Sequence, residues 1–541
     1  AVEWYAEFTH CGAENSAILE QVRLVDEVYE GASPVLLHSN GDTVDYDGYQ
    51  LLRTPVGADG IALRPLLGNP SDGAFPFMRL MTEGGGYNFA VGWPGGWLGD
   101  LDAAEGGTRV RFGQESLRAY LKPGETLRAP RVLVMAYDGD EADGRKQWRD
   151  FYRDHVLIRE AGAPLGPLNV MSYGGGGVEF TKSTEENQLA AIDGFLAKGF
   201  RPDIWWIDAG WYPCNLKWEA AGTWKPNPEH YPNGLGPVGE RCAREGIRFL
   251  QWFELERVTE GSELDVEHPE WMLYLTDENG KRDWTRMLNL ANEDCLRWAI
   301  ERVDSLICQG HVTIYRQDFN IHPPARYWAT GDEPDRAGTT ENHHIQNLLV
   351  FWDTLKERHP GLLIDNCSSG GRRNDYELMR RSVPLHYTVT QAQEVPSWDS
   401  CEFLDLWFTG MEGARLYAKF LRPRRSEPMP LVLQFHGYPG ASRSFAEQAS
   451  FAGMGMALIA MDCPGQAGYS EDVGGFLGTT VSGHIIAGLD GPPERMYYVR
   501  LHQNIRILCR LVRELDGIDT SRVFVNGGSQ GGGLGLACAA L

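Results

Sequence analysis

The most constraining feature of this sequence is an alternation of short apolar runs with helix-like stretches over residues 165–388. Such an alternation is typical of parallel strands joined by helices, in a barrel or an open sheet. The apolar runs are Leu168–Met171, Ile204–Ile207, Ile247–Phe253, Val312–Tyr315 and Leu362–Ile364, with a weaker one at Val383–Leu385. The expected helices include Glu185–Lys198, Cys295–Cys308, Glu341–His359 and Asn374–Arg381. A closed barrel needs about eight strands and only about six can be counted, so we expect an incomplete TIM-type (β/α) barrel.

The sequence changes character on both sides of this alternation. Residues 1–155 contain short β-rich runs separated by Gly, Asp, Asn and Pro turns, which is typical of a β-sandwich. Residues 389–402 carry no helix or strand pattern, and we interpret them as a junction. Residues 403–541 again combine strands and helices. The fold class we expect is therefore multidomain α/β, with a sandwich, a barrel at 165–388 and a second α/β unit.

Charge and hydropathy exclude two classes of partner. The 541 residues include 50 Lys+Arg and 74 Asp+Glu, a formal net charge of −24. This acidic balance argues against nucleic acid, because phosphate binding needs clustered Lys and Arg. No apolar run approaches the roughly 18 residues of a membrane-spanning helix, so we expect no membrane partner.

The cysteines bear on compartment and metal binding. The chain has 10 of them, scattered, with no C-x-x-C pair and no zinc-type spacing. Such a pattern favours a reduced interior, and we expect a cytoplasmic protein without metal or organic cofactor. The chain begins with Ala1 rather than Met, and a missing start would hide a signal peptide.

Polar residues gather just after the apolar runs of the barrel segment. Asp208, Glu254 and Asp318 each follow such a run, and Asn366-Cys367-Ser368 follows another. The carboxyl ends of barrel strands share one face, so these groups are expected to converge. Carboxylates with interleaved Trp suit a sugar, since acids bind hydroxyls and transfer protons while Trp faces stack on the ring. A single such residue would more simply be a helix cap, but four at the same strand end favour a site.

The same residues resemble a known family. Leu168–Thr388 is similar to the α-galactosidases of glycoside hydrolase family 36, and residues 1–155 resemble the N-terminal β-sandwich of that family without its beginning. The motifs that carry the resemblance are Ile-Asp-Ala-Gly-Trp at 207–211, Trp-Phe-Glu-x-Glu-Arg at 252–257, Tyr-Arg-Gln-Asp-Phe-Asn at 315–320 and Asn-Cys-Ser-Ser-Gly-Gly-Arg-Arg-Asn-Asp at 366–375.

The resemblance implies roles for individual residues. Asp318 would be the nucleophile that forms a covalent glycosyl-enzyme. Around the sugar it implies Asp208, Trp252, Cys367, Ser368 and Gly370, to which we add Trp211, Glu254, Arg316 and Asn366 from the same motifs. Arg316 stands where the family usually has Lys, and Asp208-Ala209 stands where many members have paired aspartates.

The proton donor is the largest departure from the family pattern. A retaining glycosidase needs two carboxyl groups about 5–5.5 Å apart. The resemblance puts the acid/base Asp near position 389, which is Val389 here, and the next carboxylates are Glu394 and Asp399. We therefore expect weak or no glycosidase activity.

The C-terminal segment contains a nucleophile motif of another kind. Gly527-Gly528-Ser529-Gln530-Gly531 follows the strand-like run Arg522–Asn526 and precedes a helix of small residues, which is the setting of the Gly-x-Ser-x-Gly elbow. His436-Gly437-Tyr438 follows another apolar run, a position that suits the second half of an oxyanion hole.

This segment resembles the acetyl xylan esterases and cephalosporin C deacetylases of carbohydrate esterase family 7, within the α/β-hydrolase fold. The resembling residues are Phe-Thr-Gly at 408–410, Phe-His-Gly-Tyr at 435–438, Asp-Cys-Pro-Gly-Gln at 462–466, Ser-Gly-His-Ile at 482–485 and Gly-Gly-Ser-Gln-Gly-Gly at 527–532. The resemblance implies Ser529 as nucleophile, with the amides of Tyr438 and Gln530 as oxyanion hole. No Asp, Glu or His follows Ser529, so the C-terminal part of this unit is expected to be missing and its esterase activity to be low.

Three interpretations remain open at this point. The first is a carbohydrate-active hydrolase that acts on an oligosaccharide or polysaccharide with α-galactosyl or O-acetyl groups. The second is a non-catalytic sugar-binding protein built from enzyme domains. The third is a joined reading frame of truncated pieces, in which exposed strand edges would favour a homo-oligomer.

Overall fold

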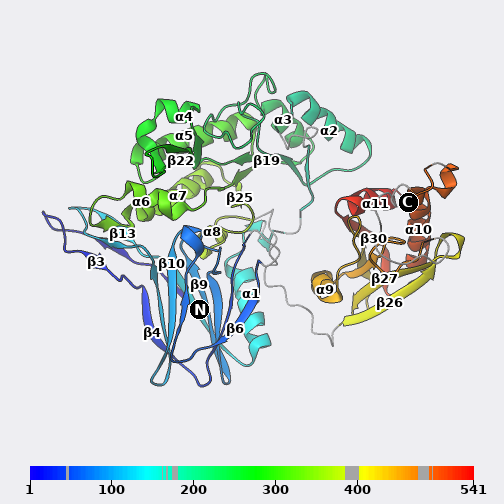
Figure 1. Ribbon diagram of the computed structural model, residues 1–541, viewed down its shortest axis with the longest axis horizontal. Coiled ribbons are helices and arrows are strands. Elements are labelled where there is room, and N and C mark those ends of the chain that lie inside the picture. Colours follow the sequence, from blue (N-terminus) through cyan, green and yellow to red (C-terminus); the bar gives the residue numbers. More distant parts are fainter. Residues whose placement is uncertain are drawn as a thin grey trace. The chain divides into compact units, whose positions relative to one another are not determined.

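The computed structural model describes residues 1–43, 48–160, 162–165, 168–173, 181–383, 401–472, 487–489 and 491–540. The chain divides into two compact units, Ala1–Val389 and Thr390–Leu541 (Figure 1). Positions 389–400 of the expected junction lie outside the described residues.

The first unit begins with two antiparallel sheets. One has the order β1-β14-β9-β8-β5-β6 and the other the order β4-β11-β10-β7 (Figure 1). Their bounds are Val2–Trp4 (β1), Arg131–Asp138 (β14), Gly85–Gly92 (β9), Phe77–Thr82 (β8), Val35–Ser39 (β5), Leu51–Pro55 (β6), Val25–Glu30 (β4), Gly107–Gln114 (β11), Trp97–Ala104 (β10) and Ile61–Leu63 (β7).

Alternation of side chains along these strands builds one core between the two sheets. Phe89 and Val91 of β9 are fully buried and share an apolar cluster with Leu101 of β10 and Val110 of β11. A strand that buries every second residue against a partner sheet is the basic element of a sandwich. Helix α1 (Glu141–His155) follows, and Asp140 caps its first turn in a capping box with Asp143.

The middle of the first unit is a parallel sheet with helices between its strands. The sheet order is β17-β18-β19-β23-β25, and every neighbouring pair is parallel. The strands are Val170–Ser172 (β17), Ile204–Ile207 (β18), Arg248–Phe253 (β19), Ile314–Gln317 (β23) and Leu363–Asn366 (β25). The helices are Glu185–Ala197 (α2), Gly236–Arg244 (α3), Glu293–Gly310 (α5), Pro324–Gly331 (α6) and Thr339–Arg358 (α7).

This sheet has five strands in the described residues, where about six were expected. The N–H of Val383 donates to the carbonyl of Ile364 at 2.7 Å, which is where a sixth strand would begin. The other two residues of the expected strand lie outside the described range. What the structure describes is therefore an open parallel sheet, and no closed barrel is seen in it.

An antiparallel sheet between β19 and α5 was not predicted. It has the order β20-β22-β21, with β20 at Arg257–Thr259, β21 at Met272–Thr276 and β22 at Arg282–Leu288. Strands β21 and β22 form a hairpin whose turn contains Asn279-Gly280, and Gly280 has a φ of +79°. Asn-Gly between β-rich runs is a strong hairpin signal, and it was available in the sequence.

The remaining elements of the first unit are short. They are Glu7–Thr9 (β2), Leu19–Glu20 (β3), Arg118–Ala119 (β12), Thr126–Arg128 (β13), Arg159–Glu160 (β15), Ala163–Pro164 (β16), Arg336–Ala337 (β24), Glu263–Glu267 (α4) and Tyr376–Met379 (α8).

The second unit is a mixed sheet with helices on both faces. Its order is β26-β27-β29-β28-β30, in which β28 is parallel to both β29 and β30. Leu458 of β29 packs with residues of α9, whereas Ile459 packs with residues of α10 and α11. The bounds are Cys401–Thr409 (β26), Arg415–Pro423 (β27), Met429–Phe435 (β28), Ala457–Met461 (β29), Ile518–Gly527 (β30), Phe445–Gly453 (α9), Tyr497–Val512 (α10) and Gln530–Ala539 (α11).

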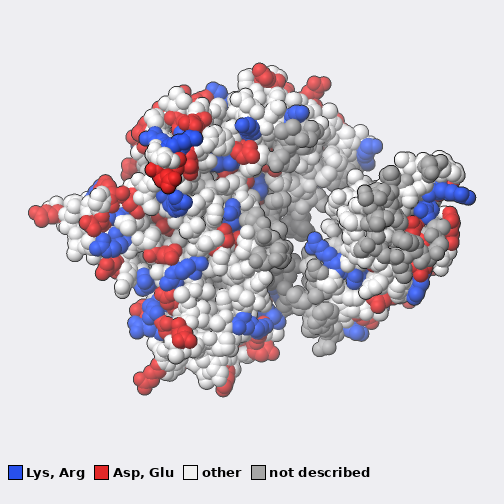
Figure 2. All heavy atoms as spheres, in the orientation of Figure 1, with Lys and Arg blue, Asp and Glu red and all other residues white. Residues whose placement is uncertain are grey.

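Among the described residues, no helix combines the length and the apolar character needed to cross a bilayer. On the face shown in Figure 2, acidic and basic side chains are interspersed.

Candidate active sites

Four strand ends of the parallel sheet place the expected polar residues along one edge. Asp208 follows β18, Glu254 follows β19, Asp318 follows β23 and Cys367 follows β25. The ladder continues beyond the strands, because the Asp318 N–H donates to Phe253 O at 2.7 Å and the Cys367 N–H to Gln317 O at 2.9 Å. These residues are therefore neighbours at one sheet edge, as parallel strand ends require.

Asp318 is held by several donors at this edge. Its Oδ2 accepts the indole N–H of Trp252 at 3.1 Å, and its Oδ1 accepts the amides of Phe319 at 2.8 Å and Ser369 at 3.3 Å. Burial by itself would raise the pKa of Asp318, but the charge of Arg316 and these hydrogen bonds lower it below the ordinary value. Asp318 is therefore an oriented carboxylate that stays ionised at neutral pH.

Arg316 lies beneath this carboxylate and is itself fully buried. Its guanidinium pairs with Asp365, which is 0% exposed, and lies over the ring of Trp206 with 4.6 Å between Cζ and the ring centroid. The accessible side of the site is formed by half-buried residues. These are Trp206, Asp208, Asn320, Ser369 and Gly370.

Glu254 and Glu256 are buried and already paired with protein groups. Glu254 accepts the amide of Asn320 at 2.5 Å and pairs with Arg257, and burial raises its pKa to about 7. Glu256 accepts from His344 at 2.8 Å and from Arg373 at 2.6 and 2.9 Å. Burial would raise the pKa of Glu256, but these partners lower it to about 2. Glu254 is 0% exposed and holds the backbone of Asn320, and its expected role in binding substrate stays a prediction.

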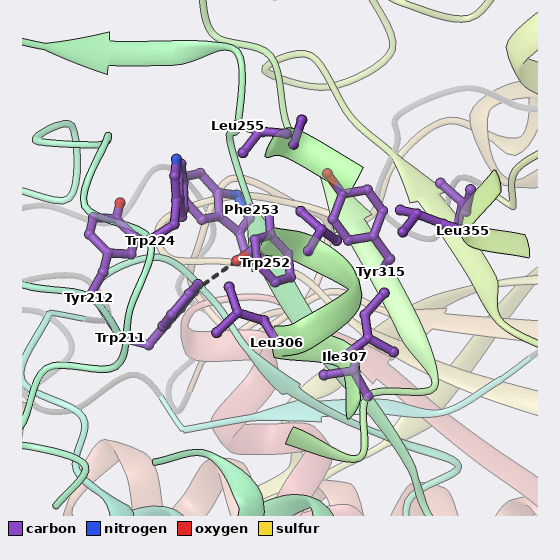
Figure 3. Packing of buried hydrophobic residues seen from close by; sticks show 14 of the residues in the cluster. Trp211, Tyr212, Trp224, Trp252, Phe253, Leu255, Leu306, Ile307, Tyr315 and Leu355 are labelled. Atoms are coloured by element: carbon purple, nitrogen blue, oxygen red, sulfur yellow. Dashed lines mark hydrogen bonds between the residues drawn. The ribbon is translucent and has the colours of Figure 1, made fainter. Parts of the chain in front are cut away.

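Trp211 and Trp252 belong to an aromatic cluster behind the sheet edge (Figure 3). The indole N–H of Trp211 donates to the carbonyl of Trp252 at 2.8 Å, and the ring of Tyr212 stacks on Trp252 with centroids 6.1 Å apart. Trp211 is 0% exposed and contacts Trp252 from within this cluster, and its expected role in binding substrate stays a prediction. Trp252 in turn aims its N–H at Asp318.

The loop after β25 is tied to the sandwich. The hydroxyl of Ser368 donates to Phe319 O at 2.7 Å, and the Asn366 side chain donates to Arg373 O at 2.7 Å. Asp42 accepts the amide of Gly371 at 2.5 Å, and an added Cβ on Gly370 (φ +118°) would lie 2.7 Å from Asp42 Oδ2. Ser368 and Asn366 therefore hold the loop, while Gly370 leaves room for a carboxylate from the sandwich.

Cys367 is buried within this loop. The amide of Gly370 donates to its Sγ at 3.5 Å, and burial raises the pKa of the thiol. The thiol is therefore an uncharged group beside Asp318. The expected acid position, Val389, lies outside the described residues.

The second unit places Ser529 on a strained turn between β30 and α11. Its backbone has φ 56° and ψ −124°, outside the usual regions for a non-glycine residue. An added Cβ on Gly527 would lie 2.3 Å from Gly531 O, and one on Gly531 would lie 2.0 Å from Phe435 O. The two glycines let the turn pass close to β28, which is the geometry of a nucleophile elbow.

The groups around Ser529 are ordered by side-chain hydrogen bonds. The Gln530 side chain exchanges hydrogen bonds with Gln466 at 2.9 and 3.1 Å, and Gln466 donates to the hydroxyl of Tyr497 at 3.0 Å. Nε2 of His436 accepts the amide of Cys463 at 2.9 Å, and burial lowers the pKa of this imidazole. His436 therefore fixes the backbone at Cys463. The motif at 482–485 lies outside the described residues.

Comparison with known proteins finds a different family model similar to each of two regions. Residues 126–395 match the melibiase family model, and residues 381–541 match the acetyl xylan esterase (AXE1) family model. We call residues 126–395 the melibiase segment and residues 381–541 the acetyl xylan esterase segment, after the family models that they match. The two matched ranges overlap at 381–395, in the region of the expected junction.

Relatives of the melibiase segment are α-galactosidases. α-Galactosidase C of Emericella nidulans is 28% identical over 326 residues, which cover 56% of this chain and 41% of the relative. α-Galactosidase AgaA of Geobacillus stearothermophilus is 25% identical over 357 residues, 62% of this chain and 48% of the relative. The chain therefore spans less than half the length of these two relatives.

Solved structures show the same fold for this segment. The crystal structure of AgaA has a TM-score of 0.57 at 20% identity, with 68% of this chain and 52% of that chain covered. The α-galactosidase from Lactobacillus brevis has a TM-score of 0.59 at 16% identity, with 72% and 52% covered.

Sequence reasoning missed several residues that line the melibiase site. Trp206 and Asn320 belong to the same motifs as Asp208 and Asp318. Their partial exposure, which only the structure shows, marks them as residues of the site. Asp42 and Tyr49 come from the sandwich, and the hydroxyl of Tyr49 donates to Gly371 O at 3.3 Å. Since both lie more than 300 residues before their partners, no local pattern predicts these contacts.

Proposed function

We propose that the melibiase segment binds a terminal α-galactosyl group and that Asp318 is its nucleophile. The observation that carries this proposal is the state of Asp318, an ionised carboxylate oriented by Trp252 and two backbone amides at the sheet edge. A nucleophilic carboxylate must be charged and fixed in direction before substrate arrives. Solved structures of AgaA variants contain stachyose and raffinose, which suggests such oligosaccharides as the ligand class.

The mechanism follows from this arrangement. Asp318 attacks the anomeric carbon, the glycosidic bond breaks, and a covalent glycosyl-enzyme forms that water then hydrolyses. The leaving oxygen needs a proton unless it leaves readily as an anion. Val389 cannot supply one, so this chain should react with activated leaving groups and only slowly with ordinary galactosides.

Trapping of the covalent intermediate tests the role of Asp318. An activated fluorinated galactosyl fluoride should add one glycosyl group to the protein, and peptide mass spectrometry should locate it on Asp318. The D318N variant should stay unlabelled, and the matched control D59N, at an exposed aspartate, should be labelled as the wild type is. Absence of label on a protein that still binds raffinose by calorimetry would instead favour the sugar-binding interpretation.

We propose that the acetyl xylan esterase segment carries the nucleophile of an acetyl-ester hydrolase at Ser529. The strained backbone of Ser529 at the start of α11 supports this, since the turn exposes the hydroxyl to a helix N-terminus. No Asp, Glu or His occurs in residues 530–541, so the base that would activate the hydroxyl is not among them. Loss of a base costs a serine nucleophile orders of magnitude in rate.

p-Nitrophenyl acetate tests the second proposal. We expect no rapid burst of p-nitrophenol, and only slow acetylation that maps to Ser529 and is absent from the S529A variant. A fast burst, or slow acetylation that S529A leaves unchanged, would contradict the assignment. The glycosyl-trapping result is independent of this outcome, because the two nucleophiles lie in separate compact units.

A further inference from the structure

Three side chains with metal-ligating atoms lie close together in the first unit. They come from α5 and from the residue after α7, whereas Asp318 follows β23. Asp304 and Cys308 lie one turn apart on α5, and His359 ends α7. Their ligand atoms, a carboxylate oxygen, a thiol sulfur and an imidazole nitrogen, all lie within 4.8 Å of one another.

The distances between these ligand atoms can be compared with the distances between the ligands of a bound divalent ion. Ligand atoms about 2.0–2.3 Å from a tetrahedral zinc ion lie roughly 3.3–3.8 Å from each other. Nε2 of His359 already lies 2.7 Å from Oδ1 of Asp304. Cys308 is exposed, so a rotation of its side chain can bring Sγ in without moving the backbone.

The backbones that carry the three ligands are well fixed. The N–H of His359 donates to Leu355 O at 2.9 Å, and its carbonyl accepts from Leu362 at 3.0 Å. Helices α5 and α7 pack against each other, with Val303 and Leu355 in the main core. Little ordering entropy therefore remains to oppose metal binding.

Surrounding charges favour a cation. Arg358 bonds the other oxygen of Asp304 at 3.2 Å and bonds Glu301 at 2.7 Å, so it orients the carboxylate while leaving Oδ1 toward His359. Hydrogen bonds to a ligating carboxylate from outside the coordination shell are usual in metal sites. Glu301, Asp304 and Arg358 together carry a formal net charge of −1.

We propose that Asp304, Cys308 and His359 bind a divalent transition-metal ion of borderline softness, Zn²⁺ above all. A thiolate, an imidazole and a carboxylate select such ions over Mg²⁺ and Ca²⁺, which prefer oxygen ligands. Three protein ligands leave one position for water. The ion replaces the His359–Asp304 hydrogen bond and clips the end of α7, just before β25, to α5. This inference does not depend on the proposed function.

Cobalt spectroscopy and thermal unfolding test the site directly. After treatment with EDTA, the full chain should bind Co²⁺ with a thiolate-to-cobalt charge-transfer band in the near ultraviolet, and Zn²⁺ should displace it. Zn²⁺ should also raise the unfolding temperature. The C308S variant should lose the band, and H359Q should weaken Co²⁺ binding at least tenfold.

Cys11, an exposed cysteine in the sandwich, supplies the matched control. C11S should keep both the cobalt band and the shift in unfolding temperature. A band that survives in C308S, a band lost in C11S, or a full chain that binds neither ion would overturn the proposal. Since Cys308 is exposed, C308S should fold as the wild type does, and circular dichroism without metal checks this.

Discussion

At the scale of single residues, a buried ion pair lies next to the carboxylate of Asp318 and acts on its charge. Arg316 pairs with Asp365 where neither side chain is more than 3% exposed. A buried charge is stable only while its partner and hydrogen bonds remain. Arg316 therefore stabilises the charged forms of two carboxylates, because it pairs with Asp365 and also lowers the pKa of Asp318.

Replacement of this cation should be costly. We predict that R316M lowers the free energy of unfolding by about 3–5 kcal/mol, because Asp365 would be buried without its cation. Urea titration followed by Trp fluorescence measures the change. The control is R53M, which removes a surface pair with Glu141 and should cost less than about 1 kcal/mol. Equal losses in the two variants would refute the argument.

At the scale of secondary-structure elements, α11 lies close to β28 at the turn that contains Ser529. Gly531 lies in the first turn of α11, where an added Cβ would lie 2.0 Å from Phe435 O. Gly533, two residues further on, has no atom within 4 Å of its added Cβ. The same helix therefore contains one glycine that packing requires and one that it does not.

This contrast gives a matched pair of substitutions. We predict that G531A destabilises the second unit or prevents its folding, since a backbone carbonyl would have to move. G533A should keep the unit folded and raise its stability by up to about 1 kcal/mol through helix propensity. Thermal unfolding of both variants measures the difference. A G531A variant as stable as the wild type would contradict this prediction, because α11 and β28 could then move apart without cost.

At the scale of the whole first unit, buried carboxylates join the sandwich to the parallel sheet. Glu377 of α8 pairs with Arg128 and Arg131 from the sandwich and with Arg381. Burial by itself would raise the pKa of Glu377, but the three cations lower it to about 2. Glu341 of α7 accepts from Trp93 and Gly96 of the sandwich and from Ser116.

The Glu377 network makes stability depend on pH. Because the folded pKa lies near 2 and the ordinary value near 4.5, its contribution is complete above about pH 5 and is lost as the pH falls toward 2. At neutral pH this is roughly 3 kcal/mol. We predict that E377Q is less stable than the wild type at pH 7 and that the difference narrows below pH 5.

Urea titrations at several pH values measure this difference in the free energy of unfolding. The control is E27Q, at an exposed glutamate of β4, which should follow the wild type throughout. A difference between E377Q and the wild type that stays constant from pH 7 to pH 3 would contradict the linkage.

Sequence reasoning located the parallel strands and the tight turn at Ser529 because their signals are local. The runs at 204–207 and 247–253 become β18 and β19 with boundaries within a residue. The strained elbow at Ser529 follows from glycine spacing alone, since only residues without Cβ allow that turn. The β20-β22-β21 sheet was not predicted, because its short strands interrupt the strand–helix alternation and only the Asn-Gly turn marks its hairpin.

The sequence by itself thus determined the strand–helix alternation of 165–388, the families that the chain resembles and the strand-end positions of Asp318 and Ser529. Only the tertiary structure decided which acidic residues are already paired with basic side chains, because burial and pairing depend on residues distant in sequence. Glu256 and Asp318 occupy similar strand-end positions, yet Arg373 pairs with both oxygens of the first and His344 bonds one of them. The same reason explains Asp42 at Gly371 and His359 beside Cys308, which the fold brings together and no spacing along the chain reveals.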